Sequence, residues 1–229
     1  MAATKCDPAV STDVAISPRP RLDLPFQWAL GESIRALPPS VQDHVLQSPG
    51  TVVLYRGRMR VWRDGGWRGK IAGWLLRVGT LARFMFPETG EEVEFEIEHA
   101  VKSHDDGSLS MSWIRTYHFH QVKRRFDALM RFHPTYGPIV LWTGCLGCLQ
   151  VELCPRVEDN AIVVVSRREW LGVGRFRIPI PGWLKGRPYV RESEEPDGAL
   201  RIHVEIHNTL LGHFFGYEGR YRKVEATTP

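Results

Sequence analysis

Residues 51–62 read TVVLYRGRMRVW and alternate apolar and basic side chains with a period of two. This alternation is typical of a β-strand that has one buried face and one solvated face. The predicted buried face consists of Val53, Tyr55, Met59 and Val61, and the solvated face carries Arg56, Arg58 and Arg60. The segment therefore predicts a sheet that covers a core on one side only.

Residues 90–102, GEEVEFEIEHAVK, repeat this pattern, with Val93, Phe95 and Ile97 alternating with glutamates. Antiparallel pairing of the two segments would place arginines opposite glutamates on the solvated face. Each such pair contributes only roughly 0.2–1 kcal/mol, but together the pairs disfavour other registers. We therefore interpret both charged rows as part of the fold and expect no nucleic-acid partner.

The rest of the chain consists largely of short extended segments, separated by turn sequences such as DDG (105–107) and PDG (196–198). Short strands in succession favour antiparallel pairing over βαβ units. The sequence predicts a mainly β (α+β) fold, either a curved antiparallel sheet or a partly open barrel of about eight to ten strands. Residues 26–47 predict two short helices broken at a proline pair, and residues 70–86 predict an amphipathic helix packed across the sheet.

The domain organisation follows from length and composition. A chain of 229 residues, 43% of them hydrophobic, can bury one substantial core. We expect a flexible arm over residues 1–25 and a single β-rich domain over residues 26–225. No signal peptide is expected, because the first residues lack a cationic start followed by an apolar run. Four cysteines are too few to staple this chain, which indicates a reducing compartment, most simply the cytoplasm.

Histidines and cysteines are possible metal ligands in this chain. His118 and His120 share one side of a predicted strand, and the segment RIHVEIHN (201–208) offers two more histidines and a glutamate. In cupin barrels a glutamate follows the His-x-His pair, whereas residues 121–124 hold none. The segment TGCLGCLQVELC (143–154) has one thiol too few for a structural zinc site. We predict no bound metal and no cofactor, while a proton-transfer role for one histidine stays open.

The predicted helix at residues 70–86 combines apolar side chains, among them Trp74, with Lys70, Arg77 and Arg83. Packing on the sheet is the simplest interpretation. A lid over a ligand cavity and peripheral contact with the inner membrane are the alternatives. Charges interrupt its apolar length too often for it to span a bilayer.

Five segments recur in a familiar order. They are VLYRGRMRVWRDGGWRGKIAGWL (53–75), EEVEFEIEH (91–99), MSWIRTYHF (111–119), RPYVRESEEPDGALRIHVEIHNTLLG (187–212) and FGYEGRY (215–221). In this order the chain resembles, from about residue 26 to 225, the bacterial family called domain of unknown function 4166.

The resemblance extends to single positions of that family's pattern. A Trp-x-Arg segment is matched by Trp113 and Arg115, an acidic position before an Asp-Gly turn by Glu192, and a closing Tyr-x-Gly by Tyr217 and Gly219. The resemblance implies no activity, although members also occur fused to oxidoreductase-like domains. It favours Arg115, Glu192 and Tyr217 over the histidines as residues of a shared site.

Two functions remain open at this point. The first is binding of an apolar small molecule or lipid in a cavity of the curved sheet. The ligand-binding candidates are Tyr55, Met59, Trp74, Phe95 and Trp113. The alternative is an enzyme that catalyses proton transfer, isomerisation or cyclisation of an apolar substrate in the same cavity. Its catalytic candidates are Arg115, Tyr117, His118, Glu192 and Tyr217. A charged group beside a carboxylate in the cavity would favour the enzyme, whereas a wholly apolar lining would favour ligand binding without a reaction.

Overall fold

The computed structural model describes residues 24–227, apart from 65, 82, 84, 134–136, 145–146 and 174–175. The expected arm at residues 1–25 falls almost entirely outside the described residues. The strands are β1 (Val52–Trp62), β2 (Gly90–Ser103), β3 (Leu109–His118), β4 (Lys123–His133), β5 (Gly137–Thr143), β6 (Leu149–Glu158), β7 (Ala161–Val173), β8 (Phe176–Pro179), β9 (Arg187–Glu194), β10 (Leu200–Asn208) and β11 (Gly212–Thr227).

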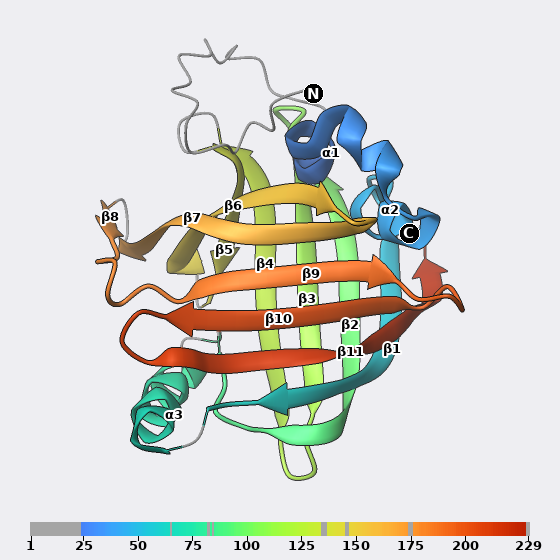
Figure 1. Ribbon diagram of the computed structural model, residues 1–229. Helices are drawn as coiled ribbons and strands as arrows, with labels where there is room; N and C mark the ends of the chain where they lie inside the picture. The colour runs from blue at the N-terminus through green and yellow to red at the C-terminus, as the bar shows by residue number, and fades with distance from the viewer. Residues whose placement is uncertain are drawn as a thin grey trace.

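Ten of these strands close into an antiparallel barrel. Their order around the barrel is β6-β5-β4-β3-β2-β1-β11-β10-β9-β7, and pairing of β6 with β7 completes the ring. The short strand β8 pairs only with β7 at the edge of the ring. Figure 1 shows β2–β5 crossing behind β9–β11 at a steep angle, with β1 bending from one layer into the other. The predicted mainly β, antiparallel architecture is confirmed.

The charge ladder expected from the first two strands is present. β1 and β2 pair antiparallel, and the ion pairs on their outer face are Arg56–Glu96 at 2.8 Å, Arg58–Glu92 at 3.4 Å and Arg60–Glu91 at 2.9 Å. These exposed pairs contribute little individually. Their alternation keeps Val53, Tyr55 and Phe95 on the inner face, where all three are buried.

The N-terminal helices cover one end of the barrel (Figure 1). They are α1 (Pro25–Leu30), the 3-10 helix η1 (Gly31–Ala36) and α2 (Pro39–Val45). The predicted break at the proline pair is confirmed, since Pro38 is extended and Pro39 opens α2. Phe26, Val41 and Val45 are buried. This end of the barrel is therefore closed by apolar packing.

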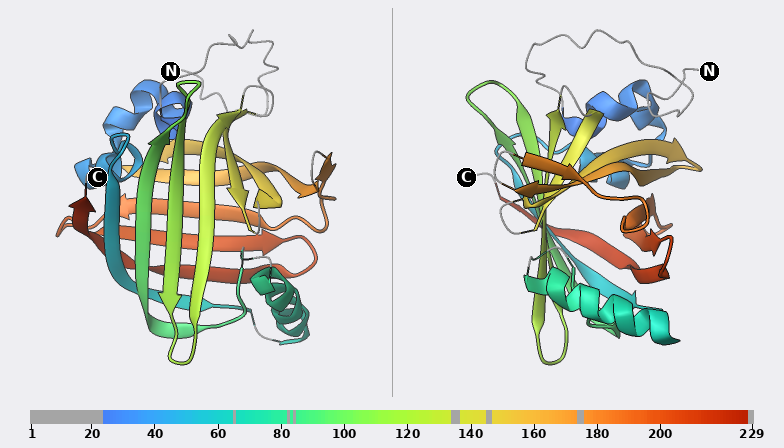
Figure 2. Two further views of the ribbon diagram at one scale, coloured as in Figure 1. Left: turned by 180° about the vertical axis from the view of Figure 1, so that it is seen from behind. Right: turned by 90° about the vertical axis from the view of Figure 1, so that its left-hand side faces the viewer.

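The second helical region differs from its prediction. Helix α3 spans Gly66–Leu81 rather than residues 70–86, and it lies beside β11. It ends early because Arg83 adopts a positive φ of 57°, which is incompatible with continued helix. Figure 2 shows α3 at the opposite end of the barrel from α1 and α2. No helix in the described part of the chain has the length and apolar character needed to cross a bilayer.

The buried face of α3 was also predicted wrongly. Gly69, Gly73 and Leu76 are buried, whereas Trp74 is 64% exposed and Ile71 is 44% exposed. The two glycines lie against residues 63–64: a Cβ on Gly69 would clash with the backbone oxygen of Asp64, and one on Gly73 would lie 2.6 Å from Arg63 Nη1. The glycines and Leu76 thus face the protein, whereas Ile71 and Trp74 face outward.

Candidate functional site

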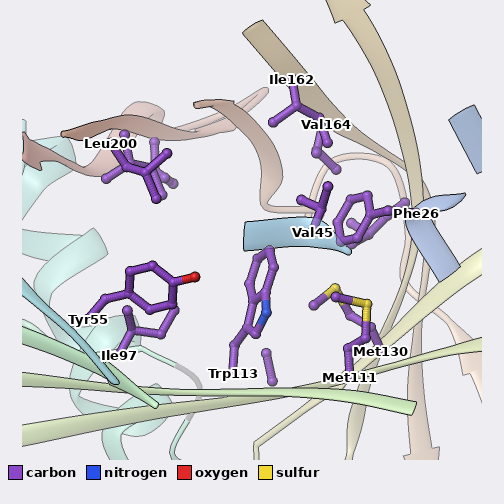
Figure 3. Close-up of a cluster of buried hydrophobic side chains, with 14 of the residues drawn as sticks. Phe26, Val45, Tyr55, Ile97, Met111, Trp113, Met130, Ile162, Val164 and Leu200 are labelled. Atoms are coloured by element: carbon purple, nitrogen blue, oxygen red, sulfur yellow. The ribbon is translucent and has the colours of Figure 1, made fainter. Parts of the chain in front are cut away.

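The barrel interior holds a cavity of about 120 Å³. Its wall is almost entirely apolar and includes Phe26, Met130, Leu141, Ile162, Val190 and Phe215. Figure 3 shows Trp113 projecting from β3 into this interior, with Tyr55 on one side and Met130 on the other. An engineered apolar cavity of roughly 150 Å³ binds benzene in another protein. The space therefore suits a ligand about the size of one aromatic ring.

Four of the five catalytic candidates meet in this cavity wall. Arg115 and Tyr117 reach it from β3, Glu192 from β9 and Tyr217 from β11. Burial raises the pKa of Tyr117 well above its usual range, so its hydroxyl stays protonated. The fifth candidate, His118, is not among them.

His118 lies on the outer face of β3, where its Nε2 is 3.3 Å from Glu96 Oε2. The alternation along the strand explains this, because Arg115 and Tyr117 occupy the inward positions. One of the two histidines of the second predicted row, His203, likewise pairs with Glu205 and Glu218 at 3.2 Å each. Within the residues that the structure describes, no three His, Cys, Asp or Glu side chains are placed to hold a metal ion.

The structure places one of the five predicted ligand-binding residues in the cavity wall. Trp113 lines the cavity. Tyr55, Met59 and Phe95 are buried inside the barrel but do not line this cavity. Trp74 lies on the outside of α3, as described above, so the structure places it away from the cavity.

Arg115 is the unusual side chain of the cavity. It is only 8% exposed, and its guanidinium lies between the rings of Trp113 and Phe126, at 5.1 Å from each centroid. Its Nε has no hydrogen-bond partner, and it forms no ion pair with another described residue. Cation–π contacts offset part of the desolvation cost, but they supply no counter-charge. A buried cation thus faces an apolar cavity.

Both oxygens of the carboxylate in the same wall have a hydrogen-bond partner. Glu192 Oε1 lies 2.7 Å from His44 Nδ1, and the Tyr221 hydroxyl donates a hydrogen bond to Glu192 Oε2 at 2.7 Å. All three side chains are buried. Burial and the negative charge of Glu192 raise the pKa of Tyr221 well above its usual range. The network brings together α2, β9 and β11.

His99 of β2 extends this polar region behind the cavity. It is fully buried, its ring contacts those of His44 and Trp113, and neither ring nitrogen has a hydrogen-bond partner. Burial, followed by the nearby His44 and Arg115, lowers its pKa well below the usual 6.5. His99 is therefore neutral in the folded protein near neutral pH.

This buried histidine predicts a loss of stability in mild acid. Below pH 6.5 the unfolded state binds a proton at His99 that the folded state does not, so the free energy of unfolding falls as pH falls, by up to about 1.4 kcal/mol per pH unit. In His99→Leu this part of the slope between pH 6.5 and 5 should disappear in urea denaturation. His120→Leu, at an exposed position, should keep the wild-type slope; equal slopes in both variants would contradict the assignment.

Sequence reasoning missed His44, His99 and Tyr221. A signal for His99 was present, since it continues the inward row of Phe95 and Ile97. His44 is likewise on the face of α2 that buries Val41 and Val45. His44 and Tyr221, which both contact Glu192, are 177 residues apart in the sequence, so local periodicity does not predict their meeting.

The cysteine cluster gives little chemistry. Cys154 is buried within β6, and Cys148 precedes that strand and is half-buried. Cys145, the third thiol of the cluster, and Cys6 lie outside the described residues. Cys154 is thus a small buried side chain within a strand.

The fold and the cavity together define the class of protein as a closed antiparallel barrel with a mostly apolar interior. Among the described residues that line this cavity, Arg115 has no ion pair and Glu192 is hydrogen-bonded. The chain belongs to the family described as domain of unknown function (DUF4166), whose model matches residues 37–221. It is also similar to the uncharacterized protein YndH of Bacillus subtilis (strain 168), with 31% identity over 153 residues. These cover 66% of this chain and 75% of YndH.

Proposed function

We propose that the protein binds a small apolar molecule that carries one acidic group, such as a compact carboxylic acid, inside the barrel. The observation that carries this proposal is Arg115, a buried side chain without an ion pair to another described residue, in a cavity wall that is mostly apolar. A buried charge is costly unless it is paired. A ligand carboxylate would supply the missing partner, and its apolar body would fill the remaining space.

The neighbouring Glu192 does not take this role. Its two oxygens are engaged by His44 and Tyr221, and it forms no ion pair with Arg115. Negative charge on Glu192 would also repel a second carboxylate placed beside it, so the ligand head is expected next to the guanidinium and the rings around it. Selectivity for an acid over a neutral analogue follows from this arrangement.

Matched ligand pairs test this proposal. Benzoate and benzamide have nearly the same shape, but only benzoate carries a charge. Isothermal titration should show benzoate, or a slightly larger aromatic or branched acid, binding at least about tenfold more tightly than its amide. Equal affinity within several such pairs would contradict the proposed role of Arg115.

A second candidate function is catalysis of proton transfer to or from carbon. The observation in its favour is the Glu192 carboxylate, which lines the cavity and is oriented from behind by His44 and Tyr221. After incubation of the ligand with the protein in D2O, mass spectrometry would detect deuterium at a carbon of the ligand. The exchange should be lost in Glu192→Gln; no exchange with any bound ligand leaves binding as the function.

A further inference from the structure

Large apolar side chains are exposed mainly at one end of the barrel. Ten such side chains are exposed in the described residues. Seven of them lie in the connections between β1 and β2, between β7 and β9, and between β10 and β11, and an eighth lies at the adjoining end of β7. Two of the ten, Leu129 and Val224, lie elsewhere. In an antiparallel barrel these three connections emerge at the same end, which is the end opposite α1 and α2.

We call this surface the apolar rim. Its most exposed members are Trp74 of α3 at 64%, Phe176 of β8 at 62%, Trp183 at 57%, Leu210 at 56% and Ile178 at 53%. Figure 1 shows α3, β8 and the β10–β11 turn along the left-hand side of the molecule, and the right-hand view in Figure 2 looks onto that side. Exposed apolar surface that is gathered on one side of a protein marks an interaction site.

The charges of the two barrel ends differ in sign. The rim end carries Lys70, Arg77 and Arg83, all exposed, and Lys185. The turns at the opposite end, residues 104–108, 159–160 and 195–199, contain five acidic residues and no lysine or arginine. The apolar rim is thus surrounded by basic side chains, whereas Glu195 and Asp197 in the turns at the far end pair with Arg201, Arg220 and Arg222.

A polar hollow lies beside α3 at the same end. It has a volume of about 430 Å³, and its wall includes Arg63, Arg77, Arg124 and Glu88. Glu88 is paired with Arg124, with 2.8 Å from Arg124 Nε to Glu88 Oε2. Three guanidinium groups against one carboxylate leave positive charge in excess, which suits a phosphate group.

We propose that the apolar rim rests on an anionic phospholipid surface, with its tryptophans among the lipid headgroups and the arginine-lined hollow facing a lipid phosphate. Tryptophan and aliphatic side chains favour the membrane interface, and basic residues around them are attracted to anionic lipid. A second copy of the chain fits less well, because a two-fold contact through this face would set two basic surfaces against each other. The inference does not depend on what the barrel cavity binds.

Vesicle flotation tests this surface. The wild-type protein should float with vesicles of phosphatidylcholine and phosphatidylglycerol, bind pure phosphatidylcholine at least about tenfold more weakly, and detach as salt is raised. Trp74→Ser with Trp183→Ser should weaken binding to the anionic vesicles at least about tenfold. The matched control, Leu129→Ser with Val224→Ser, removes two exposed apolar side chains outside the rim and should bind as wild type does.

Charge variants and oligomeric state complete the test. Lys70→Glu with Arg77→Glu should reduce binding to anionic vesicles, whereas Lys102→Glu, exposed at the far end, should not. Circular dichroism checks that every variant is folded. Equal binding by the rim variant and its control, or no binding by the wild type, would overturn the proposal. So would a wild-type dimer that the rim substitutions convert to monomer without any vesicle binding, because a second copy would then cover the rim.

Discussion

The Arg115→Met variant is expected to bind the acidic ligand at least about 30-fold more weakly than the wild type and yet to unfold at a higher temperature. Loss of a buried, hydrogen-bonded charge partner typically costs a complex 2–5 kcal/mol or more, which is at least about 30-fold in affinity. Without ligand, however, Arg115 is a largely buried cation that has no ion pair with another described residue. Methionine removes that cost and fills similar space between Trp113 and Phe126, which should add roughly 1–2 kcal/mol of stability.

The control for this prediction is Arg125→Met on the adjacent strand. Arg125 is 56% exposed and pairs with Asp127 at the surface, so its loss should change stability by less than about 1 kcal/mol and leave ligand affinity unaltered. Thermal unfolding and titration calorimetry measure both effects. If Arg115→Met bound the ligand normally, or lost several kcal/mol of stability, Arg115 would be a structural residue and not the ligand's counter-ion.

Replacing Glu192 is expected to destabilise the folded protein strongly. Glu192→Ala should lower the free energy of unfolding by about 3–5 kcal/mol, because it leaves His44 and Tyr221 buried without their shared partner. Glu192→Gln should cost less, since an amide can still exchange hydrogen bonds with both groups. Urea denaturation provides the measurement.

Glu194, two residues further along β9, is the matched control. It accepts hydrogen bonds from the backbone amide and hydroxyl of Ser40, at 2.9 and 2.6 Å, but lies near solvent. Water can replace it, so Glu194→Ala should lower the free energy of unfolding far less than Glu192→Ala does. Similar costs for Glu192→Ala and Glu194→Ala would mean that the buried network contributes no more than a surface contact does.

Much of the fold could be predicted because it follows from the alternation of apolar and polar residues along single segments. The alternation in β1 and β2 predicted the strands, their inner faces and their charge ladder. The same alternation separated Arg115 and Tyr117, which line the cavity, from His118, which does not. These features depend only on neighbouring residues, and the period of two leaves one choice of face.

Other features depend on contacts between distant segments. Closure of the ring by β6 and β7 and the meeting of His44 with Glu192, 148 residues apart, are set by the whole barrel. The face of α3 was predicted wrongly because large apolar side chains were assumed to point inward. Here glycines make the close contact, and Trp74 belongs to the apolar rim instead.

Native mass spectrometry of the freshly purified protein shows whether the barrel holds an acidic ligand beside Arg115. We expect a 1:1 complex with a small molecule that carries one acidic group, retained by the wild type and absent from Arg115→Met. A bound molecule without an acidic group, or the same molecule held equally well by Arg115→Met, would contradict it. So would a wild-type protein that stays empty when titrated with a graded series of aromatic and branched acids.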